Sequence, residues 1–252
     1  MKKILLIAIL VFCGGCLTNR YDRITQTSTI DALLAGAYDG QMTCRQLLTY
    51  GDFGIGTFDK LDGEMAILDG RIYQIKSDGK VYRPVSDIKT PFATVCNFKP
   101  DTQFKIQTAD FKTVESIIDE KVPNQNQFLA VKISGTFKHI KVRSVPAQQK
   151  PYPPLAEVAK TQPVFEINDV TGTIVGFRTP PFVKGLNVPG CHFHFLSSDF
   201  TQGGHILDFE LASGKCEIDK CNEFLLILPK DDSLKNIDLS KDKSEELQKV
   251  EK

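Results

Sequence analysis

The stretch Gly190-Cys191-His192-Phe193-His194-Phe195 holds two of the four histidines of this chain, and a third, His205, follows eleven residues after His194. Residues two apart on a β-strand point to the same face, so His192 and His194 would lie side by side, about 6.5–7 Å apart at the backbone. Residues 197–204 are mostly polar and end in two glycines, which predicts a hairpin loop. The returning strand would place His205 beside the pair as a cross-strand neighbour.

Three neutral imidazoles on one face can bind a metal ion and leave its fourth coordination position open, which is the arrangement of a catalytic zinc site. The alternative is three unrelated histidines on a solvated hairpin. We favour the metal site because the chain has only four histidines in total. Cys191 would point to the opposite face of the strand and is expected in the core.

The overall composition is that of a globular protein, with 41% hydrophobic and 25% charged residues among 252. This length can bury one large core or two smaller ones. Lys plus Arg equals Asp plus Glu, at 31 each. Without a net positive charge, nothing favours binding to nucleic acid or to an anionic membrane surface.

The first residues have the pattern of a signal peptide. Residues 1–3 are Met-Lys-Lys, residues 4–12 are apolar but too short to span a bilayer, and residues 13–16 are Cys-Gly-Gly-Cys. The small residues before Cys16 resemble a bacterial lipobox, although Cys13 stands where leucine is common. We therefore expect an exported protein, periplasmic or extracellular, whose Cys16 is a candidate lipidation site and membrane anchor. Cleavage without lipidation, giving a soluble secreted form, is the alternative.

The mature chain is predicted to be an α/β protein of the α+β type, with two β-sheet-based subdomains, a few short helices, and mainly antiparallel or mixed sheets. After the signal peptide (1–16) and a tether (17–27), we expect an N-terminal mixed α/β domain (28–148). A C-terminal metal-binding β domain with a charged tail (149–252) would follow. The boundary is set by four prolines within residues 146–154, a density that excludes regular structure.

Local patterns support these elements. In the first half, Asp-Gly pairs separate short apolar runs, which is typical of consecutive hairpin strands. Residues 110–122 have helical periodicity, and residues 127–145 alternate as a long strand or a hairpin. Of the five cysteines after Cys16, Cys216 and Cys221 are close enough in sequence to be considered as a disulfide pair.

Two charged residues are candidates for chemistry beside a metal. Glu64 begins an apolar strand; an inward side chain would make it an acid or base with a raised pKa, whereas an exposed position is equally compatible with the sequence. Arg143 alternates with His139 and Lys141. An inward Arg143 could bind a substrate carboxylate, but the sequence alone favours a basic strand on the surface. His139 is expected on the surface or behind the site and not as a ligand.

Together these segments resemble bacterial α-acetolactate decarboxylase over nearly all of the mature chain. The resembling segments are residues 33–40, 51–58, 61–65 and 69–70, the basic strand that reaches Arg143, and the histidine segments 190–195 and 203–205. The resemblance implies zinc held by His192, His194 and His205, and a homodimer built through the N-terminal sheet. It further implies that Glu64 and Arg143 line the site, that Thr57 lies near it, and that Glu251 folds back to the metal.

The implied reaction is metal-dependent decarboxylation of (S)-2-acetolactate (2-hydroxy-2-methyl-3-oxobutanoate) to (R)-acetoin and CO2, with zinc as the electron sink. Arg143 would orient the departing carboxylate, and Glu64 or Glu251 would deliver a proton. The sequence does not distinguish the two glutamates, nor acetolactate from 2-aceto-2-hydroxybutyrate.

Two other functions are considered. A cupin-like metal-dependent oxygenase would also carry His-x-His on a strand, but a glutamate ligand should follow within a few residues, and here only Asp199 is near. A non-enzymatic exported lipoprotein that binds metal would leave Glu64 and Arg143 without a purpose.

Overall fold

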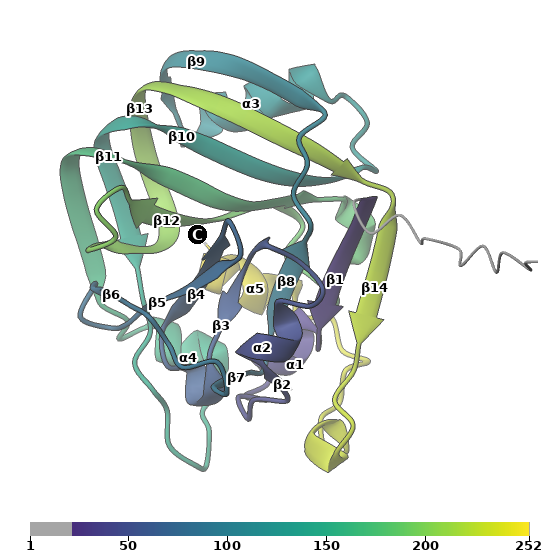
Figure 1. The fold of residues 1–252 in the computed structure, drawn as a ribbon. Coiled ribbons are helices and arrows are strands. Elements are labelled where there is room, and N and C mark those ends of the chain that lie inside the picture. Colours follow the sequence, from purple (N-terminus) through teal and green to yellow (C-terminus); the bar gives the residue numbers. More distant parts are fainter. Residues whose placement is uncertain (1–21, 252) are drawn as a thin grey trace, which may run out of the picture.

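The computed structural model describes residues 22–251, which form two large β-sheets packed against each other, a small two-stranded sheet and short helices around them (Figure 1). The expected signal peptide, Cys16 and the first part of the expected tether lie outside the described residues. Among residues 22–251, no helix combines the length and hydrophobicity that crossing a bilayer requires. The mixed, mainly antiparallel α+β class predicted from the sequence is confirmed.

The first sheet has seven strands in the order β14-β1-β8-β3-β4-β5-β6. Its strands are β1 (Arg23–Thr27), β3 (Phe53–Thr57), β4 (Glu64–Leu68), β5 (Arg71–Ile75), β6 (Val81–Tyr82), β8 (Ala93–Cys96) and β14 (Glu223–Ile227). An Asp-Gly pair joins β4 to β5 as predicted. Asp69 has φ 51° and Gly70 has φ 72°, the left-handed pair that a two-residue hairpin turn needs. This tight turn fixes the register that carries Glu64 on β4.

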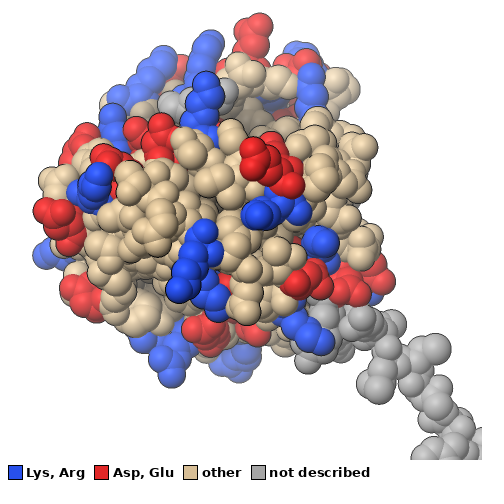
Figure 2. Space-filling view, turned by 90° about the horizontal axis from the view of Figure 1, so that it is seen from above, with Lys and Arg blue, Asp and Glu red and all other residues tan. Residues whose placement is uncertain are grey.

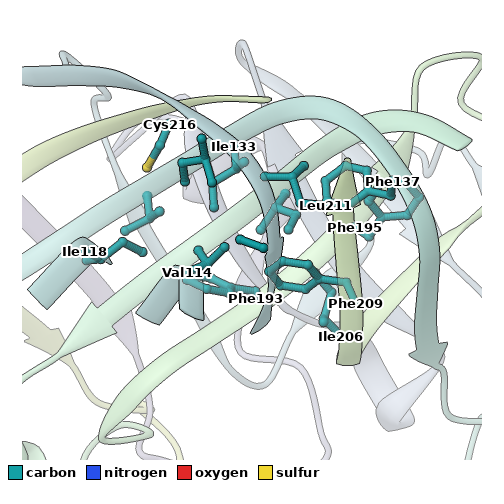
Figure 3. Packing of buried hydrophobic residues seen from close by; sticks show 14 of the residues in the cluster. Val114, Ile118, Ile133, Phe137, Phe193, Phe195, Ile206, Phe209, Leu211 and Cys216 are labelled. Atoms are coloured by element: carbon teal, nitrogen blue, oxygen red, sulfur yellow. The ribbon is translucent and has the colours of Figure 1, made fainter. Parts of the chain in front are cut away.

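The second sheet has five strands: β9 (Thr102–Asp110), β10 (Phe128–Arg143), β11 (Val164–Thr179), β12 (Gly190–Ser197) and β13 (Gly203–Cys221). It closes on itself, because β10 pairs with β13 as well as with β11. Aromatic side chains fill its interior, among them Phe137, Phe193, Phe195 and Phe209 (Figure 3). The histidine hairpin therefore stands on a rigid, fully packed support.

Helices close the ends of the sheets. Helix α3 (Phe111–Lys121) confirms the predicted helix, and its N-cap Asp110 accepts a 2.8 Å hydrogen bond from the backbone N–H of Thr113. The remaining elements are α1 (Ile30–Leu34), α2 (Cys44–Leu47), α4 (Leu155–Ala159), α5 (Ser244–Glu251), the short strands β2 (Met42–Thr43) and β7 (Lys89–Thr90), and the 3-10 turns η2 (Asp59–Leu61), η3 (Pro181–Val183) and η4 (Asp232–Leu234). Buried side chains of α1, α4 and α5 share one hydrophobic cluster. Ile30, Leu33 and Leu155 of this cluster line the same cavity as the histidines of the hairpin.

The domain division differs from the prediction in two places. Residues 23–27, expected in the tether, form strand β1 inside the first sheet, parallel to β14 (Figure 1). Their polar side chains suggested an exposed segment, but the amide of Gln26 is buried and donates hydrogen bonds to the carbonyl oxygens of Ser28 and Leu186 at 2.8 and 2.7 Å. These hydrogen bonds allow a polar residue to lie inside the protein. The sheets also do not separate at residue 148. Strands β9 and β10 belong to the second sheet, and β14 returns to the first.

The surface carries mixed charge. On the face seen in Figure 2, acidic and basic side chains are interspersed among neutral ones. Single ion pairs between strands contribute to this pattern, for example Lys138 with Glu210 at 2.6 Å.

The structure excludes a disulfide between Cys216 and Cys221, the pair considered from its spacing. Both residues lie on the continuous strand β13, five positions apart. Five strand residues span about 16 Å, far beyond the reach of a disulfide. An odd separation also turns the two thiols to opposite faces, and they join different hydrophobic clusters.

Candidate metal centre and active site

The hairpin brings three imidazoles together, as its sequence predicts. His192 and His194 lie on β12, and His194 is the direct cross-strand partner of His205 on β13. The ring centroids are 4.9 to 5.4 Å apart, and one ring nitrogen from each lies within 4.8 Å of the others. All three side chains are buried. We call these residues the histidine centre.

The protonation of the histidine centre suits metal binding. The pKa of His192 is lowered to about 3 by burial and by the positive charge of Arg143, and the pKa values of His194 and His205 also lie well below the usual range because of burial. Neutral imidazoles at ordinary pH keep a lone pair available for a cation.

A backbone contact aims His194 into the centre. Its Nδ1 donates to the carbonyl oxygen of Met65 at 2.7 Å, so Nε2 carries the lone pair. This Nε2 is buried and has no hydrogen-bond partner among residues 22–251. A buried nitrogen without a partner is costly unless a ligand satisfies it. The residues present therefore fit a metal ion.

Glu64 lies inside the site, the inward alternative of the two considered. It begins β4, pairs in register with Thr57 on β3, and is 6% exposed. Its Oε2 lies 3.5 Å from Nε2 of His194, and its Oε1 accepts a 3.0 Å hydrogen bond from Nη1 of Arg143. Burial raises the pKa of Glu64 to about 7, against the opposing effect of Arg143. Thr57 is also buried, and its hydroxyl donates to the carbonyl oxygen of Gly63 at 2.7 Å.

The sequence favoured a surface position for Arg143, and this prediction is wrong because the side chain is buried. Arg143 stands opposite His205 of β13, next to a register shift at which Leu207 of β13 has no partner on β10. Its side chain is buried, and its Nη2 donates to the carbonyl oxygen of Val250 at 3.1 Å. Its Nε has no hydrogen-bond partner among the described residues. The guanidinium thus keeps one free donor inside the site.

Helix α5 adds Glu251, near the middle of the molecule (yellow in Figure 1). The Glu251 carboxylate lies 3.6 Å from Nε2 of His192, 3.7 Å from Nε2 of His205 and 3.8 Å from Nη2 of Arg143. Burial raises its pKa to about 7. His139 stays outside: it contacts Glu166 on the neighbouring strand and is partly exposed.

These groups surround a small cavity of about 40 Å³. Its polar wall is the histidine centre with Thr57, Glu64, Arg143 and Glu251, and its apolar wall is formed by Ile30, Leu33, Leu61, Phe92, Val145 and Leu155. The apolar wall was not found from the sequence, since these residues come from separate segments and look like ordinary core. A larger groove of about 490 Å³ runs along the outer side of α5 and shares Glu251.

Comparisons with known proteins identify the family of this chain. The family model of alpha-acetolactate decarboxylase matches residues 24–241. The chain is 48% identical over 235 residues to the alpha-acetolactate decarboxylase of Methanosarcina mazei, covering 93% of this chain and 82% of that protein. It is 45% identical over 229 residues to the protein of that name from Methylococcus capsulatus, covering 90% and 88%.

The fold matches as well. The crystal structure of alpha-acetolactate decarboxylase from Bacillus subtilis strain 168 superposes with a TM-score of 0.89 at 38% identity, covering 91% of this chain and 99% of that one. Sequence, fold and the buried centre thus lead to one assignment: the chain belongs to the alpha-acetolactate decarboxylase family, a family of carbon–carbon lyases.

Proposed function

We propose that the protein decarboxylates (S)-2-acetolactate to (R)-acetoin and CO2 at the histidine centre. The observation that carries the proposal is the enclosure of three neutral imidazoles, one arginine and two glutamates in a single cavity. Family membership supplies the substrate class. Loss of CO2 leaves an electron pair on carbon, so such a site must stabilise negative charge, hold the carboxylate and return a proton.

His192, His194 and His205 would hold zinc, since three nitrogen ligands leave a coordination position open for substrate. Bound there, zinc supplies a Lewis acid that stabilises negative charge developing on substrate oxygen. The contact between His194 and the Met65 carbonyl keeps the ring in the required tautomer and orientation.

Arg143 would bind the substrate carboxylate. Its guanidinium is buried, and its Nε is without a partner among the described residues. Two parallel N–H donors hold a carboxylate in a defined plane, which lets the breaking bond align with the adjacent carbonyl π system. The charge of Arg143 is balanced by Glu64 and Glu251 while no substrate is bound.

Glu64 and Glu251 are the proton donors available to the product carbon. Glu64 is held on strand β4 and Glu251 on helix α5, so they approach the cavity from different elements. Delivery of a proton from one fixed direction gives acetoin of a single hand. The apolar wall around Leu33 and Leu155 would receive the methyl groups of the substrate.

The size of the cavity bears on how substrate enters the site. A cavity of about 40 Å³ has room for roughly three water molecules, which is less than a keto acid occupies. Helix α5 separates this cavity from the larger groove, and Glu251 borders both. We therefore propose that outward displacement of α5 opens the site and that its return excludes water.

We also propose that the mature protein is exported to the periplasm or the cell exterior, with Cys16 as the candidate lipid anchor. The basic, apolar and small-residue segments within residues 1–16 support this location. A homodimer through the first sheet is proposed from the family resemblance. The edge strand β14 and the partly exposed Leu225 on it are compatible with such a contact. Sedimentation of the purified protein tests the dimer.

The decisive experiment is incubation of the purified protein with racemic acetolactate, with and without a metal chelator that is then back-titrated with zinc. We expect acetoin and CO2, loss of both with chelator, and recovery with zinc. Oxygen consumption without acetoin would favour the cupin-like oxygenase. Bound metal without turnover would favour a metal-binding lipoprotein.

A further inference from the structure

A second buried group of reactive side chains lies between the two sheets. Cys96 ends strand β8 of the first sheet, and Cys221 ends strand β13 of the second. Their sulfur atoms and a carboxylate oxygen of Asp219 all lie within 4.8 Å of one another, and all three residues are almost completely buried. We call these three residues the sulfur cluster.

The core holds the two cysteines side by side. Cys96 pairs with Ile24 of β1, and Cys221 pairs with Phe128 of β10. All four side chains belong to one hydrophobic cluster that also contains Phe53. In the structure both thiols are reduced, and Cys96 is hydrogen-bonded to Cys221. One S–S bond between them would link the two sheets covalently.

A metal ion is the less suitable occupant. Structural zinc sites have four ligands, and the described residues supply three here. One oxygen of Asp219 already accepts a 2.8 Å hydrogen bond from the backbone N–H of Lys99. Burial and the neighbouring Cys221 also raise the pKa of Cys96 well above the usual range, which opposes the thiolate that a metal needs.

We propose that Cys96 and Cys221 form a disulfide bond that joins the two sheets when the chain folds in an oxidising compartment. The proposal rests on the export proposed above and is independent of the reaction at the histidine centre. Both sulfur atoms are inaccessible in the folded protein, so the bond forms before the sheets close over them.

The oxidant is a disulfide, of an exchange protein or of a small thiol. The thiolate of one cysteine attacks this disulfide, giving a mixed disulfide and one released thiol. The second cysteine then attacks the mixed disulfide, giving the Cys96–Cys221 bond and a second released thiol. Two electrons pass to the oxidant, and the two protons lost by the cysteines are carried by the released thiols.

The bond would close the loop of residues 96–221, which contains Arg143 and the histidine centre. Closing a long loop lowers the entropy of the unfolded chain, and we expect a rise in Tm of about 10 °C. The geometry of the site should be unaffected, since the sulfur cluster does not line its cavity.

The test is peptide mapping of the full chain purified from cells that export it, with free thiols alkylated in denaturant before digestion without reduction. We expect one linked pair of peptides containing Cys96 and Cys221, and alkylated Cys44, Cys191 and Cys216. A parallel sample, denatured, reduced and refolded in a mixture of oxidised and reduced glutathione, tests the geometry separately from export. The linked pair should form there as well.

Stability provides the second measurement. The Tm difference between oxidised and reduced refolded protein should disappear in Cys96→Ala and in Cys221→Ala but persist in the control Cys216→Ala, which is equally buried. Five alkylated thiols after oxidative refolding would overturn the proposal. So would a second equivalent of zinc that is lost in Cys96→Ala. If either alanine variant fails to fold, the peptide map of the unaltered chain decides alone.

Discussion

The histidine centre and the sulfur cluster are both buried groups of three potential ligand atoms within 4.8 Å, yet their surroundings differ. Around the histidine centre stand two glutamates and an arginine, and atoms such as Nε2 of His194 lack partners among the described residues. Around the sulfur cluster stand Ile24, Phe53 and Phe128. Burial alone therefore does not mark a reactive site. Unsatisfied donors and acceptors facing a cavity do.

The largest effect is expected from a substitution in the histidine centre, which tests whether this region, unlike the sulfur cluster, binds metal and supports catalysis. His194→Ala should remove bound metal and lower acetoin formation more than about 100-fold, since loss of a ligand should exceed the effect of losing one of its supporting contacts. Metal content and turnover are measured on the same sample. The control His139→Ala should keep both, because His139 lies outside the cavity. An active, metal-free His194→Ala protein would contradict the role of the histidine centre as a catalytic metal site.

Substitutions of Arg143 test whether the charged residues around the histidine centre contribute to catalysis. Arg143→Gln should lower kcat/KM by about 100-fold, and Arg143→Lys should restore part of it, because a positive charge returns without the planar pair of donors. Arg178→Lys is the matched control, since Arg178 is also buried but contacts Asp119 and backbone carbonyls away from the cavity. It should lower Tm and leave kcat/KM of the folded protein unchanged. Equal kinetic losses in both would contradict a carboxylate-binding role.

The two glutamates can be separated by the handedness of the product. Replacing the proton donor should lower kcat by about 100-fold and reduce the optical purity of acetoin, since solvent then supplies the proton from either side. Glu64→Gln and Glu251→Gln are compared by chiral chromatography. One variant should lose optical purity and the other keep it. Unchanged optical purity in both would exclude direct proton delivery by either side chain.

The smallest effect concerns the sulfur cluster. Burial raises the pKa of Asp219 to about 7 from 3.8. Between these values the folded state holds a proton that the unfolded state has lost, so stability falls as pH rises, by at most about 1.4 kcal/mol per pH unit. Asp219→Asn should lose this slope in urea unfolding. Asp110→Asn, at an exposed helix cap, should retain it. An unchanged slope in Asp219→Asn would show that another group causes it.

The parts of the molecule that the sequence predicted are local. The spacing of His192 and His194, the Asp69-Gly70 turn and helix α3 each depend on neighbours within a few residues, and each is present as expected. The resemblance also pointed to Glu251, which the structure places beside the histidine centre. Local periodicity and turn chemistry were sufficient for these elements.

The parts that could not be predicted depend on distant contacts. Arg143 follows the alternation of His139 and Lys141 along β10, but Glu64 of β4 and Val250 of α5 cover its side chain, so a position that reads as surface is buried. The sequence of strand β1 looks like a polar tether, because one hydrogen-bond partner of the Gln26 amide, the carbonyl oxygen of Leu186, lies 160 residues away. The prolines of residues 146–154 mark irregular chain, but they lie against the core: Tyr38 donates a 2.9 Å hydrogen bond to the carbonyl oxygen of Pro153. Composition therefore misplaced the division between the sheets.

The parallel pair of β1 and β14 has a consequence for the order of assembly. Arg23–Thr27 adjoins Glu223–Ile227, so a strand that emerges first from a ribosome or translocation pore must wait for one that emerges late. Closing so long a loop costs conformational entropy, and this cost comes before the stabilisation that the pairing of β1 with β14 provides. The edge of β1 that later pairs with β14 therefore stays exposed while the rest of the chain emerges. A chaperone could bind this strand during that interval.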